Sequence, residues 1–228
     1  MIDHAHDLAS VQEATYRLLT AVAKLDDASI ARPSRLPDWT VGHVLAHLAR
    51  NADALTNVLD GRPMYVSGDA RDADIARDAP RPLDTQLTDL RESDARFRAR
   101  GAEPADWTRT VELRNGVTDT AARVPFRRWG EVELHHVDLG IGYELEDLPE
   151  EFTEREIDFL AARFLAHPDV PATRITDGTR AWHTGRQASR PEVTVTGRPA
   201  DLLGWLAGRR AEAVLEVSGG TLPALPPL

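Results

Sequence analysis

Apolar residues recur at helical spacing in the first quarter of the chain. The earliest run is Leu8, Val11, Ala14, Leu18 and Val22. This spacing predicts a helix over 7–25. A second, longer amphipathic helix is expected to open at Asp38-Trp39-Thr40, whose side chains can cap a first turn, and to end near Gly61. The proline-containing stretch 31–37 between the two is expected to be a turn.

Two more helical patterns follow, over 82–100 and from about Pro125 through Asp138. The segment 61–80 is rich in glycine and aspartate, and we expect it to be a long loop. Four helices within the first part of the chain are typical of a helix bundle. The sequence therefore predicts a four-helix bundle with one long loop.

The pattern changes after residue 148. A helix is expected over 154–167, and apolar residues then alternate with a period of two, which predicts strands over 173–176, 192–196 and 213–217. A short helix, 199–206, precedes the last strand, and the tail 221–228 is expected to be extended. The predicted fold is a mainly α domain, 1–148, followed by a small α+β domain, 149–228, with about three strands.

The chain of 228 residues contains no cysteine, which excludes disulfides, thiolate metal sites and cysteine nucleophiles. Any metal must then be held by histidines and carboxylates. No apolar run approaches the roughly 18 residues that span a bilayer, and the first residues lack the basic start and apolar core of a signal peptide. We therefore expect a cytoplasmic protein.

The charge balance disfavours polyanionic partners. Lys and Arg total 27 against 37 Asp and Glu, a net charge of −10, which works against binding to nucleic acid or a membrane surface. Lys24 is the one lysine, and the arginines that make up the rest can bind carboxylates with a planar, bidentate geometry. Small anionic molecules are the expected partners, and a monomer is the expected assembly.

Histidine placement suggests a metal site. On a helical wheel, His47 of the second helix lies on the flank of the apolar stripe, whereas His43 points closer to solvent. His47 alone could equally be a hydrogen-bonded histidine at the edge of the core.

The fourth helix is apolar on two opposite faces, so it is expected to be buried. Glu131, His135 and Asp138 form a polar line between those faces, and such groups must pair with each other or bind a metal. Glu131 and His135 at i and i+4, with His47 from a facing helix, would supply the three protein ligands of an open zinc site, with Asp138 orienting an imidazole. The alternative is a Glu–His ion pair without metal. His136 lies on the other side and is expected to be packed.

Three segments carry a family resemblance: DWTVGHVLAHLARNADAL at 38–55, RWGEVELHHVDLG at 128–140 and GRPADLLGWLAGR at 197–209. Together they resemble the mycothiol-dependent maleylpyruvate isomerase family. This resemblance implies a DinB-like metal-binding four-helix bundle joined to an α+β domain similar to sterol carrier proteins.

The resemblance also implies site residues and cofactors, namely Zn²⁺ and the low-molecular-weight thiol mycothiol. The family's zinc ligands fall on His47, Glu131 and His135. Arg209 and Asp138 are the expected catalytic residues, and the substrate-binding arginines would be Arg209 together with Arg71, Arg77 or Arg81. The alternative for Arg209 is a solvated cation at a helix C-terminus, where positive charge is favourable.

The implied reaction is the cis–trans isomerisation of maleylpyruvate to fumarylpyruvate, in the gentisate branch of aromatic degradation in actinobacteria. A thiolate would add reversibly to the double bond. Two alternatives stay open: a mycothiol S-transferase that acts on another electrophile, and a non-catalytic protein that binds a metal or a small molecule.

Overall fold

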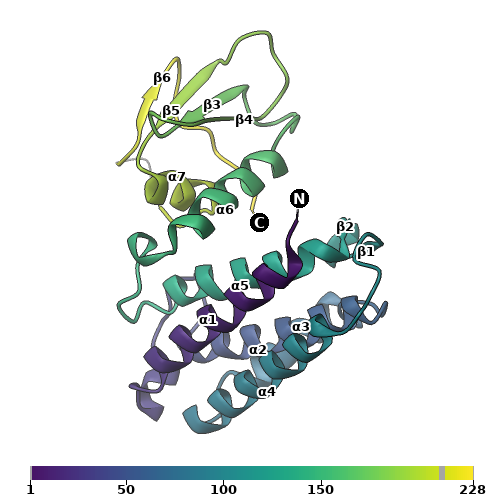
Figure 1. The fold of residues 1–228 in the computed structure, drawn as a ribbon. Coiled ribbons are helices and arrows are strands. Elements are labelled where there is room, and N and C mark those ends of the chain that lie inside the picture. Colours follow the sequence, from purple (N-terminus) through teal and green to yellow (C-terminus); the bar gives the residue numbers. More distant parts are fainter. Residues whose placement is uncertain (1, 211–213, 228) are drawn as a thin grey trace. The chain divides into compact units, whose positions relative to one another are not determined.

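The computed structural model describes residues 2–210 and 214–227. The chain divides into two compact units, Met1–Tyr143 and Glu144–Leu228 (Figure 1). The first unit is mainly helical, and the second combines two helices with a sheet. The predicted fold class, a helical bundle followed by a small α+β unit, is confirmed.

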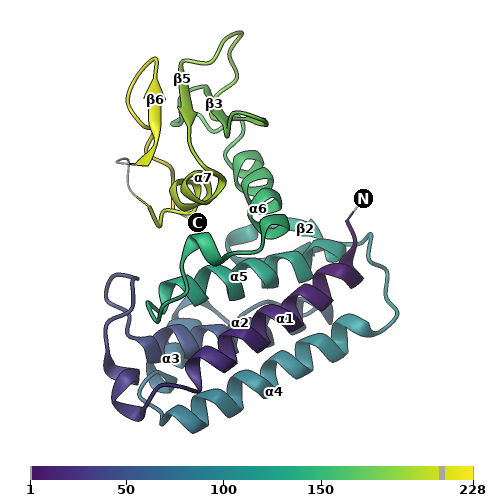
Figure 2. The ribbon, with the colours of Figure 1, turned by 60° about the vertical axis from the view of Figure 1, so that its left-hand side comes forward.

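Four long helices build the first unit: α1 His4–Val22, α2 Val41–Leu59, α4 Leu83–Ala102 and α5 Val124–Asp138. Helix α1 packs on α5 and α4, and α2 packs on the same two helices, so the four helices close into a bundle (Figures 1 and 2). Each predicted helix is present, with its ends shifted by a few residues.

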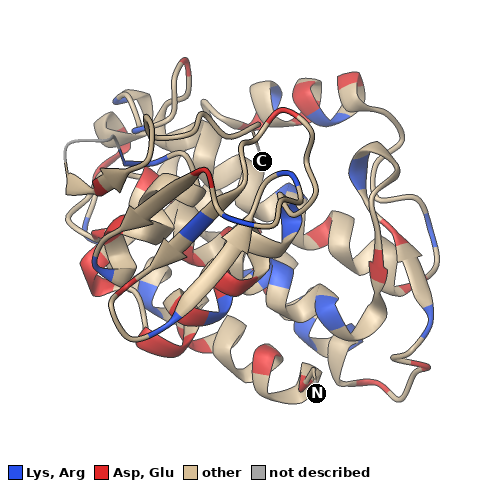
Figure 3. Cartoon of the chain, turned by 90° about the horizontal axis from the view of Figure 1, so that it is seen from above, with Lys and Arg blue, Asp and Glu red and all other residues tan. Residues whose placement is uncertain are grey.

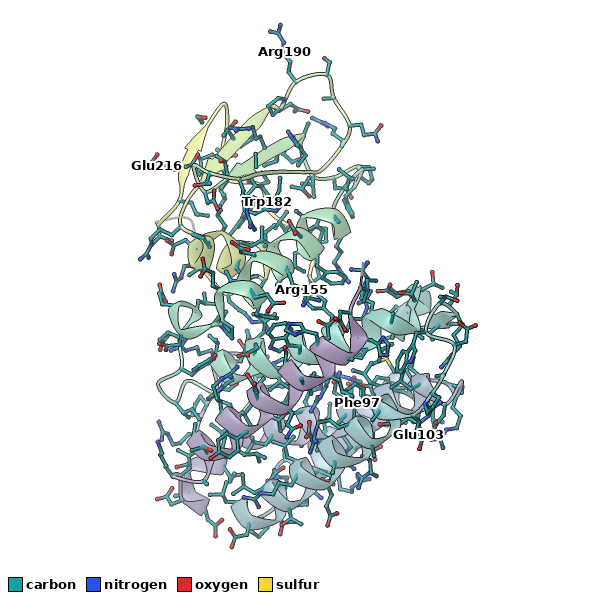
Figure 4. The ribbon with its side chains drawn as sticks, in the orientation of Figure 1. Phe97, Glu103, Arg155, Trp182, Arg190 and Glu216 are labelled. Atoms are coloured by element: carbon teal, nitrogen blue, oxygen red, sulfur yellow. The ribbon has the colours of Figure 1, made fainter. Side chains whose placement is uncertain are left out.

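The core of this bundle is formed by the apolar stripes that the sequence shows. Leu18 of α1 and Leu48 and Leu55 of α2 are almost completely buried. So is Phe97 of α4, which lies inside the bundle (Figure 4). Burying a side chain of this size contributes roughly 1.5–3 kcal/mol relative to leaving it in water. The stripes therefore fix which face of each helix is available for a site.

The sequence analysis expected one long loop over 61–80. The structure instead contains a helix in this segment, α3 Gly68–Asp78. Ser67 caps this helix by accepting a hydrogen bond from the amide of Ala70 at 3.0 Å. Ile75 is its only large apolar residue, and it is buried where α3 packs on α2. One apolar anchor gives no detectable period, so the helix depends on its cap and on tertiary packing.

A small antiparallel hairpin between α4 and α5 was also not predicted. Its strands are β1 Thr110–Glu112 and β2 Thr118–Thr120. Asn115 and Gly116, with φ of 59° and 72°, turn the chain between them. Short 3₁₀ segments lie at Asp27–Ala31, Arg114–Gly116 and Ala121–Arg123.

The second unit contains a four-stranded sheet in the order β4-β3-β5-β6. Strands β3 and β5 are parallel, and the other neighbours are antiparallel. Helices α6 and α7 lie on one side of the sheet (Figure 2). The elements are a 3₁₀ turn at Leu145–Asp147, α6 Glu150–Arg163, β3 Thr173–Thr176, β4 Ala181–Thr184, β5 Val193–Thr196, α7 Pro199–Leu206 and β6 Glu216–Ser218.

Strand β4 is the element of this unit that the sequence analysis missed, so the sheet has four strands and not three. Two of its four residues are exposed and one is half-buried, so the strand shows little apolar alternation. Trp182 of β4 donates a hydrogen bond to Asp158 of α6 (Figure 4). The expected strand over 213–217 is observed as β6 at 216–218, and Ala213 lies outside the described residues. Helix α7 has the predicted bounds.

Acidic and basic positions are interspersed along the ribbon of both units (Figure 3). Within the described residues, no helix combines the length and hydrophobicity needed to cross a membrane.

Candidate metal centre

Three potential metal ligands converge between α2 and α5. The Nε2 atom of His47 lies 3.0 Å from Oε2 of Glu131, and Nε2 of His135 lies 3.3 Å from the same oxygen. One ligand atom from each residue lies within 4.8 Å of the others. In the described part of the chain, this is the one group of histidines and carboxylates with such geometry.

The local sequence explains why His47 and His43 have different roles. Thr40 caps α2, and the Nδ1 atom of His43 accepts a hydrogen bond from the Thr40 amide at 3.3 Å. His43 is therefore occupied at the helix end, while His47, one turn later, is 5% exposed and faces α5. The wheel predicted this separation of the two histidines.

Asp138 orients His135. Its carboxylate accepts a hydrogen bond from Nδ1 of His135 at 2.8 Å, and the side chain is 1% exposed. Burial would lower the pKa of His135, but the hydrogen bonds to Asp138 and Glu131 raise it. Because Nδ1 is bound to Asp138, Nε2 is the ring nitrogen that lies towards Glu131, at 3.3 Å from its Oε2 atom. This is the usual arrangement of a metal-binding histidine.

His47 and Glu131 are in the protonation states that metal ligands require. Burial lowers the pKa of His47 to about 4, which leaves the imidazole neutral at pH 7. Burial acts to raise the pKa of Glu131, but hydrogen bonds from His135 and His47 lower it well below the ordinary value. Metals bind neutral imidazole and ionised carboxylate, so the charge states of both residues suit a metal site near neutral pH.

The donor set fits a divalent metal. Two imidazole nitrogens and one carboxylate oxygen form the protein part of many catalytic zinc sites, in which the fourth position is open. The same donors also accept nickel, cobalt or iron. The Glu131 side chain is 33% exposed, so the cluster is accessible from outside the bundle.

Of the three arginines predicted in the loop after α2, Arg71 lies at this cluster. Its Nη2 atom is 3.2 Å from Nδ1 of His47. Its guanidinium carbon lies 6.0 Å from the centre of the Trp39 ring and 5.9 Å from that of Tyr65, within cation–π range. The side chain is 12% exposed. These contacts hold the positively charged side chain of Arg71 in place beside the potential metal ligands.

Arg77 and Arg81 have other partners. Arg77 is exposed and pairs with Asp74 and Asp78. Arg81 pairs with Asp89 and donates to the backbone oxygen of Asp78. Of these three arginines, only Arg71 lies next to the cluster, where it could contact a substrate as predicted.

Arg209 belongs to the second unit, directly after α7. Its Nη1 atom donates to the backbone oxygen of Ala207 at 2.7 Å. A substrate contact of Arg209 stays a prediction.

Two aromatic residues at the cluster were not identified from the sequence. The Trp39 ring lies 5.5 Å from that of His47, and burial raises the pKa of Tyr65, which also senses the charge of Glu131. Tyr65 was missed because its segment was assigned to a loop, and Trp39 because it was considered only as part of a helix start. An aromatic residue in a polar segment was the available signal.

Arg128 was also missed, although it is fully buried between the same two helices. Its Nη1 atom donates to the backbone oxygen of Leu48 at 2.9 Å and to Oδ1 of Asn51 at 2.8 Å. Burial lowers the pKa of this guanidinium. Because Asn51 follows His47 by one turn and Arg128 precedes Glu131 by three residues, these bonds connect α2 to α5 next to the cluster.

The remaining polar residues of α5 serve packing. Glu133, 1% exposed, accepts hydrogen bonds from Arg17, from Trp129 at 3.1 Å and from Tyr143 at 2.8 Å. The His136 ring stacks on Tyr143 at 4.0 Å and is buried, as predicted for a packed histidine.

Comparisons with known proteins point to one family. Residues 11–140 match the family model of the mycothiol maleylpyruvate isomerase N-terminal domain, and residues 147–227 match that of the C-terminal domain of the same isomerase. The crystal structure of a mycothiol-dependent maleylpyruvate isomerase is 26% identical, covers 99% of this chain and 97% of its own, and has a TM-score of 0.88. A histidine-to-alanine mutant of that isomerase gives 25% identity, the same coverages and the same TM-score. No curated protein matches the chain.

Proposed function

We propose a function from one premise: the chain belongs to the mycothiol maleylpyruvate isomerase family, whose two domain models match residues 11–140 and 147–227. The proposed activity is the mycothiol-dependent cis–trans isomerisation of maleylpyruvate to fumarylpyruvate. We place this activity in the cytoplasm.

The observation that carries the proposal is the convergence of His47, Glu131 and His135 within the N-terminal domain. These three side chains would hold a divalent metal, for which zinc is our choice. When bound, such a metal lowers the pKa of a coordinated thiol, so that a thiolate is available near neutral pH.

The chain itself has no cysteine, so the thiol must come from outside. The conjugated cis double bond of the substrate becomes a single bond when the thiolate adds to one of its carbons and the electron pair of the double bond moves to the carbonyl, which becomes an enolate. The intermediate can then rotate about that single bond. When the enolate collapses, the thiolate leaves and the trans double bond forms, so the thiolate is regenerated unchanged.

The residues of the chain have separate tasks in this scheme. Asp138 holds the proton on Nδ1 of His135 and thereby fixes the direction of Nε2. Arg71 lies beside His47 and would neutralise a substrate carboxylate or the enolate that develops during addition. Arg209 is proposed for the same charge neutralisation from the second unit.

The decisive assay uses purified protein and maleylpyruvate, with and without mycothiol, and follows the loss of the enol absorbance of the substrate. We expect turnover only when both mycothiol and metal are present. Chelated protein should stay inactive when thiol alone is added. An undiminished rate without thiol would show that the mechanism is wrong. A stable sulfur conjugate in place of the trans isomer would identify an S-transferase.

A further inference from the structure

A pocket of about 580 Å³ lies in the first unit. Its walls come from the end of α2, the segment 61–68 that leads into α3, and the hairpin β1–β2. None of the predicted site residues lines the pocket, and the cluster of His47, Glu131 and His135 does not line it either.

Tyr65 connects the pocket to the metal centre. Its side chain lines the pocket, and its ring centre lies 5.9 Å from the guanidinium carbon of Arg71. Arg71 in turn contacts His47 at 3.2 Å. Burial raises the pKa of Tyr65, the charge of Glu131 raises it further, and Arg71 and Arg114 lower it. A molecule seated in the pocket would contact Tyr65, which leads through Arg71 to His47.

The pocket wall combines polar groups of both kinds with apolar surface. Arg114 and Asn115 offer donors, and Glu112 and Thr110 offer acceptors. Val58 and Val111 supply apolar contacts. Such a mixture suits a ligand with many hydroxyl groups on carbon rings, because each hydroxyl donates and accepts while the ring faces pack on aliphatic carbon.

The volume distinguishes between the two reactants of the proposed reaction. Pockets of roughly 300–1,000 Å³ accommodate molecules of drug size. Maleylpyruvate is a small diacid that would leave most of this space to water. Mycothiol carries its thiol on a larger, hydroxyl-rich sugar–cyclitol body, which matches both the size and the polarity of the pocket.

We propose that this pocket binds the hydroxyl-rich body of the thiol, so that the thiol group extends past Tyr65 to His47, Glu131 and His135. The inference rests on the proposed function and adds to it the position of the thiol.

Thr110 allows a direct test. It lies exposed on β1 and lines the pocket, so Thr110→Trp would fill the space with an indole. Thr88 of α4 is also exposed and does not line the pocket, which makes Thr88→Trp the matched control. Both variants are compared with the parent protein after loading with Zn²⁺ and measurement of the metal content.

The measurement is the Kd of mycothiol by titration calorimetry. The control ligand is 2-mercaptoethanol, a small thiol that lacks the sugar–cyclitol body. Thr110→Trp should raise the Kd of mycothiol at least about tenfold, while metal content and the Kd of 2-mercaptoethanol stay unchanged. Thr88→Trp should match the parent for both thiols. Arg114→Ala should weaken mycothiol binding by several-fold and leave 2-mercaptoethanol unaffected.

The two possible failures can be distinguished. If the parent binds mycothiol and Thr110→Trp binds it equally well, the pocket assignment is wrong and the proposed function stands. If the parent binds 2-mercaptoethanol but not mycothiol, the proposed function itself fails. If Thr110→Trp does not fold, Arg114→Ala decides, and an unchanged Kd there overturns the inference.

Discussion

His43 and His47 are of the same residue type, lie one turn apart on α2 and nevertheless have different chemistry. His43 is a capping residue that accepts a hydrogen bond from the Thr40 amide. His47 is buried, and its Nε2 atom lies 3.0 Å from Glu131. The difference follows from the apolar stripe of α2, which turns His47 towards α5 and leaves His43 at the helix end.

Replacement of the cluster residues should remove the metal. We expect about one equivalent of divalent metal in the purified protein and almost none in His47→Ala, Glu131→Ala or His135→Ala, because a zinc site with two protein ligands is weak. His43→Ala is the matched control and should keep the metal. Elemental analysis after desalting is the measurement, and full occupancy in His135→Ala would contradict the assignment.

Asp201 of α7 should make the stability of the second unit depend on pH. The side chain is 2% exposed and accepts hydrogen bonds from Arg198 at 2.7 Å and from Arg210. Burial would raise the pKa of Asp201, but these hydrogen bonds lower it. The folded carboxyl thus releases its proton more readily than the unfolded one, whose pKa is about 3.9. Its stabilisation is complete above about pH 5 and declines as the pH falls through the folded pKa.

We therefore expect Asp201→Asn to destabilise the second unit by about 2 kcal/mol at pH 7, and by much less near pH 3. Hydrogen exchange of the β3 and β5 amides, followed by mass spectrometry, reports on this unit separately from the bundle. An equal loss at both pH values would show that the charge of Asp201 is not responsible.

At the scale of elements, the start of α2 is held by a close contact with the end of α3. A Cβ atom added at Gly42 would lie 2.1 Å from the backbone oxygen of Ala79 and 2.6 Å from Cγ2 of Ile30. Only glycine allows this approach. The contact fixes the part of α2 that carries His47, so it also determines the position of the candidate ligand.

Gly42→Ala should destabilise the first unit by about 2–3 kcal/mol, because the backbone of Ala79 cannot yield easily. Gly68→Ala is the control: an added Cβ there meets nothing within 4 Å, at the first residue of α3. That variant should be neutral or more stable by up to about 1 kcal/mol. The stability of both variants is measured by urea unfolding, which is followed by hydrogen exchange of the α2 amides. A neutral Gly42→Ala would mean that α3 is free to move away.

Elements with a strong local signal could be predicted, and the others depend on packing. Helices α2 and α7 have a capping residue or an initial proline together with a clear apolar face, and the sequence located both. Helix α3 and strand β4 have few buried side chains and were missed. Their formation depends on neighbours that are distant in the sequence, which a periodicity cannot show.

On the scale of the whole molecule, the sequence predicted which helix faces would meet. The wheels of the second and fourth helices placed His47, Glu131 and His135 on facing sides, and the structure brings the three together. The residues around the cluster were harder to predict from the sequence. Arg71 could not be separated from Arg77 and Arg81, because the choice depends on where α3 packs, and Tyr65 lies in the same segment.

The second unit should contribute to catalysis through Arg209. If Arg209 neutralises a carboxylate or the enolate, Arg209→Met should lower kcat/KM by about 30- to 1000-fold, as expected for a lost charge-assisted contact of roughly 2–4 kcal/mol. Arg210 is unsuitable as the control, because it pairs with Glu146 and Asp201.

Arg190 serves as the control instead, since it projects from the exposed loop between β4 and β5 (Figure 4). Arg190→Met should retain the parent rate, and both variants should retain the metal. Full activity in Arg209→Met would leave the second unit without a role in the chemistry.

The pairing of His47 with Glu131 also affects how the bundle folds. The two residues are 84 positions apart, so a bound metal would act as a cross-link that closes a loop including α3, α4 and the hairpin. An unfolded chain offers no such pair of ligands at a fixed distance, so the metal would bind the folded bundle and favour it by mass action. Cells short of metal would then hold a bundle that is less resistant to unfolding and to proteolysis, as well as less active. Metal supply would control the lifetime of the protein along with its activity.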